Sequence, residues 1–172
     1  MTERLRLMHP PDIAVYFDNN LYPLKWKPWP EDIPPDMSGL PSIDRAMYLF
    51  NSVKFHLKQH YSFYNDDTFA ASIQDFYYGN AQEKANNRLW FVQFLLVLAF
   101  GTAFLTKSRN PQEPPGAKYF VRAMALMPDL TTLWKDSVLA IEVLILAGIY
   151  LYSIDKRERA HVYVSPYHAW DL

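Results

Sequence analysis

Apolar residues recur at steps of three and four from residue 42 onward. Between residues 42 and 61 they define one face of a helix, with charged and amide side chains mostly opposite: Ile43, Ala46, Met47, Phe50, Val53, Leu57 and Tyr61. This spacing predicts an amphipathic helix. Ser42 is the expected N-cap residue, because a serine hydroxyl accepts a hydrogen bond from the first helical turn.

A second, shorter helix is predicted over residues 68–78. The polar residues 65–67 before it form a loop that offers a cap, and Gly79 with Asn80 ends it. A long helix is then expected over residues 82–107. Its apolar residues surround the helix axis, which predicts burial on most sides. Ala99 and Ala103, one turn apart, make a small face that another helix can approach closely.

Two more helices are expected towards the end of the chain. One covers residues 117–127 and stops at Pro128, and the other covers residues 134–155. Period-two alternation is almost absent along the chain. The predicted fold class is therefore all-α, a bundle or array of about five to six helices.

The N-terminal 41 residues have a different composition. Eight of the 13 prolines lie there: Pro10, Pro11, Pro23, Pro28, Pro30, Pro34, Pro35 and Pro41. Proline fixes φ and removes a donor, so this stretch cannot hold a long helix or a central strand. Its aromatic residues favour an extended arm more than a plain linker would require. We expect residues 1–41 to form a linker or arm, with linker the preferred interpretation, and residues 42–164 to form the domain.

Composition limits the classes of function. The chain has 172 residues, a formal net charge of -1 and no cysteine. The balanced charge argues against a nucleic-acid-binding surface. Without cysteine, the chain cannot form a disulfide, a thiolate zinc site, an iron–sulfur cluster or a cysteine nucleophile. The N-terminus has no apolar run of signal-peptide length, so we expect no secretory signal.

Two apolar stretches raise the question of a membrane. Residues 89–105 form a run that falls just short of a bilayer core, and residues 138–154 contain Glu142. We interpret the first as a buried core helix and not as a membrane span. A small single-span membrane protein remains an alternative.

Two constellations could carry chemistry. His56 and His60 stand at i and i+4, which places two imidazoles on one helical face, but Leu57 stands where metalloproteases have a glutamate. No third ligand is evident. Glu142 lies in an apolar stretch, so burial should raise its pKa, and we expect a carboxyl hydrogen-bonded between helices and not a catalytic acid.

Motifs for nucleophilic catalysis and phosphate binding are missing from the sequence. The aromatic residues Tyr64, Phe76, Tyr77 and Tyr78 are typical of core and helix-end packing, because few cations stand between them. We therefore assign no catalytic residue, no metal ligand and no cofactor, and we expect a protein that is not an enzyme.

One partial repeat signature is present. Phe120, Ala123 and Pro128 match the second helix of a tetratricopeptide unit, but the first-helix pattern is absent upstream and nothing similar recurs about 34 residues on. A helical-repeat module for protein interaction is the alternative that this signature leaves open.

The order of the segments over residues 41–164 resembles the fungal-specific transcription factor domain. This is the middle homology region downstream of the binuclear zinc cluster in fungal regulators. Phe55-His56 is similar to the end of its first helix, and Asp66-Asp67-Thr68-Phe69 to its acidic loop. Three later patches follow in the family's order: Leu98-Ala99-Phe100-Gly101, Tyr119 to Ala123, and Tyr150 to Ser153.

The resemblance implies a nuclear protein that regulates transcription. The family binds DNA through a module of six cysteines and two zinc ions, so any DNA contact and any zinc would belong to a module outside these residues. After residue 164 the resemblance stops, and residues 165–172 form an atypical tail. Because Val164-Ser165 can be encoded by an intron donor sequence, we expect a retained intron or a short paralogue, and hence only the N-terminal half of the domain.

Half a domain leaves apolar helix faces without their usual partners. Exposed apolar area costs about 25 cal/mol per Å², which is large against a total stability of about 5–15 kcal/mol. We therefore expect self-association, a protein partner or poor folding.

Overall fold

Six helices and no strand are present in the part of the chain that the structure describes. This computed structural model describes residues 24–57, 66–105, 113–128 and 138–154. The helices are α1 (Ile43–Leu57), α2 (Asp66–Tyr78), α3 (Ala81–Asn86), α4 (Arg88–Leu105), α5 (Ala117–Leu126) and α7 (Val138–Ser153). The all-α prediction is confirmed.

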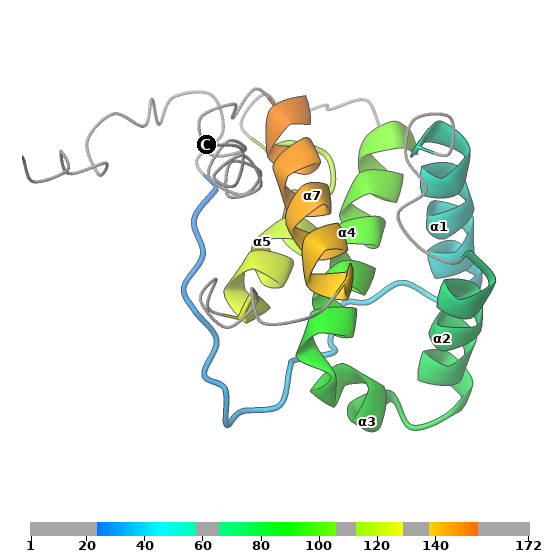
Figure 1. The fold of residues 1–172 in the computed structure, drawn as a ribbon, viewed down its shortest axis with the longest axis vertical. Helices are drawn as coiled ribbons and strands as arrows, with labels where there is room; N and C mark the ends of the chain where they lie inside the picture. The colour runs from blue at the N-terminus through cyan, green and yellow to red at the C-terminus, as the bar shows by residue number, and fades with distance from the viewer. Residues whose placement is uncertain (1–23, 58–65, 106–112, 129–137, 155–172) are drawn as a thin grey trace, which may run out of the picture.

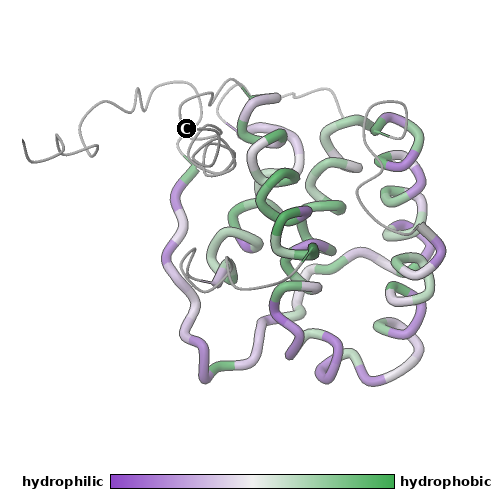
Figure 2. The backbone as a smooth tube through the Cα atoms, viewed as in Figure 1, coloured by the Kyte–Doolittle hydropathy of each residue, from purple (hydrophilic) through white to green (hydrophobic). Residues whose placement is uncertain are grey.

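Helix α4 is the centre of the fold. It contacts α1 on one side and α5 and α7 on the other, while α2 and α3 close the α1 side (Figure 1). All residues from Trp90 to Gly101 are buried, and the hydropathy of α4 and α7 is high along most of their length (Figure 2). A helix that is apolar around its whole circumference is stable when neighbours cover it. The predicted burial of this segment on most sides is confirmed.

Two glycines let neighbouring backbones approach α4. A Cβ atom added to Gly101 would lie 2.6 Å from the carbonyl oxygen of Leu49 on α1. Gly116, at a φ of 81°, precedes α5 and has no room for a Cβ against the backbone of Ala99. Ala99 therefore does lie at a close approach, although the neighbour is the start of α5, whereas Ala103 is half-buried.

The expected long helix over residues 82–107 is wrong in one respect, because it is interrupted at Asn87. Asn87 has a non-helical ψ of 81° and closes α3. Its side-chain Oδ1 accepts a hydrogen bond from the N–H of Trp90 at 3.2 Å, which caps the start of α4. Asparagine competes with the helix for backbone donors, and here its capping bond starts a new helix.

The other helix boundaries agree with the sequence to within a few residues. Ser42 caps α1, with its Oγ accepting from the N–H of Arg45 at 3.4 Å. Helix α2 begins at Asp66, so Asp66 and Asp67 belong to the helix and not to the loop before it. Helix α5 ends one residue before the predicted Met127. The predicted ends of helices at residues 61 and 107 and the start at 134 lie outside the described residues.

Residues 24–41, which we call the arm, run without helix or strand along the side that carries α5 and the start of α4 (Figure 1). Leu24 and Pro35 are buried, and the ring of Trp26 meets Phe120 edge-on at 6.1 Å. For this part of the chain the extended arm is the correct description, and the preferred interpretation as a linker is wrong. Residues 1–23 lie outside the described residues.

One helix, α4, has the length and apolar composition that crossing a membrane requires. Neighbouring elements bury 67% of its apolar window.

Candidate functional site

The residues that carry the family resemblance meet at one place in the core. The ring of Tyr150 on α7 stacks on Phe120 of α5, with centroids 4.3 Å apart. Its edge meets Phe100 of α4 at 5.5 Å. The Tyr150 hydroxyl donates to the carbonyl of Pro115 at 2.7 Å, and burial raises the pKa of this phenol. We call Phe100, Phe120 and Tyr150 the aromatic junction.

The aromatic junction joins three helices that are far apart in the sequence. Phe100 belongs to the Leu-Ala-Phe-Gly patch, and the same patch supplies Gly101 to the crossing with α1. Phe120 and Ala123 are fully buried on α5. These two residues also belong to the partial tetratricopeptide signature, whose Pro128 is half-buried beyond the end of α5.

A polar pair connects α4 to α7 beside this junction. Gln93, only 2% exposed, donates from Nε2 to Oε2 of Glu142 at 2.8 Å. Burial raises the pKa of Glu142, and the hydrogen bond from Gln93 acts in the opposite direction. The prediction of a carboxyl hydrogen-bonded between helices is confirmed. Gln93 as its partner was not predicted, because sequence alone does not fix the rotation of one helix against another.

His56 lies at the surface end of α1. Its Nδ1 is 2.7 Å from the carbonyl oxygen of Ser52, and its ring stacks on Phe104 of α4 at 4.4 Å. His60 lies outside the described residues. Within the described ranges, no group of three side chains suited to holding a metal ion comes together.

The aromatic residues of α2 divide between core and surface. Phe76 is buried against Trp90, Phe91 and Phe94. The Tyr77 hydroxyl donates to the carbonyl of Pro41 at 2.6 Å, and burial raises the pKa of Tyr77 to about 12. Tyr78 is 79% exposed. Packing of Phe76 and Tyr77 agrees with their interpretation as core and helix-end residues, and Tyr64 lies outside the described residues.

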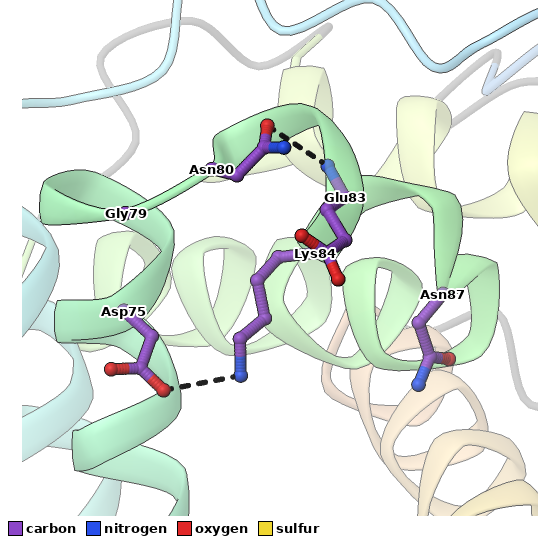
Figure 3. A pocket seen from close by; sticks show the side chains of 6 residues that line it. All are labelled: Asp75, Gly79, Asn80, Glu83, Lys84 and Asn87. Carbon is purple, nitrogen blue, oxygen red and sulfur yellow. Dashed lines mark hydrogen bonds and ion pairs between the residues drawn. The ribbon is translucent and has the colours of Figure 1, made fainter.

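A hollow of about 400 Å³ lies at the corner between α2 and α3 (Figure 3). It is lined by Asp75, Gly79, Asn80, Glu83, Lys84 and Asn87. Most of these side chains already have a structural role: Lys84 pairs with Asp75 at 3.3 Å, and Asn80 caps α3 through the N–H of Glu83. The hollow is therefore a polar helix corner, and its shape follows from the ends of two helices.

The arm is held mainly by side-chain donors that reach its carbonyl groups. The guanidinium of Arg88 donates to the carbonyls of Trp29, Pro30 and Ile33, and Arg122 donates to Ser38 at 2.6 Å. Sequence analysis missed both arginines. Arg88 preceded an apolar run and carried no other signal, so its partners, 55 to 59 residues away, could not be foreseen.

No protein-family model matches this chain, and the comparisons with curated proteins and with solved structures likewise find no match. The zinc module of the family that the sequence resembles needs six cysteines, and this chain has none. Its residues therefore do not fit such a zinc site. The family assignment remains a prediction from the order of the sequence patches.

Proposed function

We propose that this chain is a non-enzymatic regulatory domain that acts in transcription control in the nucleus. It is of the kind that follows the zinc cluster in fungal regulators. It acts through protein contacts and reaches DNA only through a separate module. This proposal rests on the resemblance over residues 41–164.

The observation that carries it is the aromatic junction. The patches at residues 98–101, 119–123 and 150–153 are separate in sequence, yet Phe100, Phe120 and Tyr150 are in mutual ring contact through Tyr150. Sequence patches that define a family are often those that hold its core together. The contact supports reading the three patches as parts of one conserved kind of domain, and it favours no chemistry at this place.

The outer surface of α7 suits a protein that works through contacts. Val138, Ile141 and Tyr152 are 74%, 41% and 61% exposed, and their spacing places them along one side of the helix. Exposed apolar side chains grouped in this way are typical of interaction surfaces. Because the partner is unidentified, the test addresses the regulatory effect itself.

The test joins residues 1–172 to an unrelated DNA-binding module and measures a reporter gene in fungal cells. We expect transcription to change severalfold relative to the module alone. Tyr150→Ala should abolish the change, because it removes the centre of the aromatic junction. Tyr78→Ala, which alters an exposed ring, is the matched control and should leave the effect intact.

The opposite result is also clear. If the wild-type fusion is abundant, nuclear and helical, and the reporter stays at the level of the module alone, the proposed regulatory function is wrong. An equal effect of the wild-type and Tyr150→Ala fusions would separate the activity from this fold and would also contradict the proposal.

A further inference from the structure

The arm lies on a surface whose chemistry matches a proline-rich chain. Within residues 24–41 five positions are proline, and each lacks a backbone donor. We define the arm-binding surface as Tyr77, Arg88, Phe120, Arg122 and Ala125. Three of these side chains donate to carbonyl groups of the arm, and one accepts the edge of Trp26. Aromatic grooves that recognise extended proline-rich segments use this combination of ring contacts and donors.

The arm offers almost only acceptors in return. The Trp29 N–H, which donates to the Ala125 carbonyl at 2.7 Å, is the one backbone donor recorded between the arm and the helices in the described residues. Arg122 retains a donor without a partner, since its Nη2 is buried with no hydrogen bond. Burial also lowers the pKa of this guanidinium. The surface is thus a donor-rich site for a chain that displays carbonyl groups.

The contacts end at a hinge. Ser38 is the last arm residue held by Arg122, and Pro41 is held by Tyr77 on the helical body. Between them lies Gly39, which has a φ of 68° and nothing within 4 Å of the position of a Cβ atom. A residue in open space between two anchors can change its backbone angles without disturbing either one. Released at Gly39, the arm keeps its own anchors and loses only the surface that receives them.

We propose that the arm-binding surface is a docking site for a second copy of this chain, through exchange of residues 24–41. A second copy carries the same arm, so every contact listed above is reproduced between the two chains without any new interface. Each chain gives one arm and receives one, which closes the assembly as a symmetric dimer. The proposal names a partner for the self-association expected from the sequence, and it does not depend on the function proposed above.

A cross-linking experiment tests it directly, because the chain has no cysteine. One population carries Pro28→Cys on the arm and the other Ala125→Cys on α5, next to the Trp29–Ala125 hydrogen bond. The two are mixed at high concentration and treated with a short thiol cross-linker. We expect heterodimers at a yield about tenfold above that of Pro28→Cys mixed with Asn51→Cys, an exposed position on α1. Arg88→Gln in the Ala125→Cys chain should lower the yield.

Two outcomes overturn the proposal. One is cross-linking of the double variant within a single chain while the mixed populations give no heterodimer. The other is an equal yield from the Asn51→Cys control. A synthetic peptide of residues 24–41 should compete with the heterodimer, and equal competition by a scrambled peptide would exclude the second copy as the specific partner.

The unsubstituted chain provides a test that does not depend on the folding of variants. Sedimentation should show a dimer that converts to monomer when the peptide of residues 24–41 is added in excess. A chain that stays monomeric at every concentration overturns arm exchange. A dimer that persists in saturating peptide overturns it as well.

Discussion

The Gln93–Glu142 pair is the polar contact within an otherwise apolar meeting of α4 and α7. A buried amide such as Gln93 is costly unless it is hydrogen-bonded, and Glu142 supplies that bond at 2.8 Å. Glu142 in turn is partly exposed, so water reaches its carboxyl group. The pair therefore satisfies the amide while leaving the carboxyl able to titrate.

Replacing Glu142 by glutamine should change how stability depends on pH. Burial raises the folded-state pKa of Glu142 above its ordinary value of 4.5. Between that value and the raised pKa, the folded state binds more protons than the unfolded chain, so this group makes stability fall as pH rises. Glu142→Gln removes that contribution and keeps an acceptor for Gln93. Its gain at neutral pH should be below about 1 kcal/mol, because solvent screens a partly exposed group.

Urea unfolding at about pH 4.5 and about pH 7 measures this difference. Glu83→Gln, an exposed change on α3, is the control and should keep the wild-type pH profile. An unchanged profile in Glu142→Gln would show that the carboxyl does not differ between the folded and unfolded states.

At the residue scale, sequence predicted the role of Glu142 but not its partner. A carboxyl within an apolar run implies a hydrogen bond, because an unpaired one is too costly. The identity of the partner depends on which side of α4 faces α7, and α4 is apolar all around. The pattern therefore gave no preferred face, and Gln93 could not be selected.

At the element scale, the contact between α1 and α4 depends on the absence of a side chain at Gly101. Alanine in a helix is ordinarily favoured over glycine by about 1 kcal/mol. Here the added Cβ would lie 2.6 Å from the Leu49 carbonyl oxygen and 2.7 Å from its Cβ. Backbone atoms of a packed helix cannot move aside as a flexible side chain can, so the clash outweighs the propensity.

Gly101→Ala should therefore destabilise the protein by about 1–3 kcal/mol, the range of overpacked cores. Chemical denaturation followed by circular dichroism measures the effect. Thr102→Ala is the matched control on the next residue, because its hydroxyl bonds only to Leu98 of its own helix. A Gly101→Ala variant as stable as the wild type would mean that α1 and α4 are not closely packed at Leu49.

The elements differ in how far sequence could define them. Helices α1, α2 and α5 have clear periodicity with glycine, proline or serine at their ends, and their boundaries followed from these residues. The separation of α3 from α4 did not, since Asn87 resembles any polar residue in a helix until its capping bond with Trp90 forms. The course of the arm depends on contacts of Arg88 and Arg122 across 55 or more residues. Periodicity does not describe such contacts.

At the scale of the whole molecule, α4 joins everything else. Helices α1, α3, α5 and α7 all contact it, and Arg88 at its start holds the arm. The aromatic junction ties α4, α5 and α7 together at the other side of the core. These contacts predict that the described helices unfold as one cooperative unit, as the account of three convergent sequence patches requires.

Native-state hydrogen exchange is the measurement that tests this central claim most directly. We expect the buried amides of α4, α5 and α7 to exchange with one common free energy, equal to that of global unfolding. Tyr150→Phe, which removes the bond to Pro115, should lower all three together by about 1 kcal/mol. If α7 instead exchanges well before α4, or if Tyr150→Phe weakens α7 alone, the three patches do not share one core.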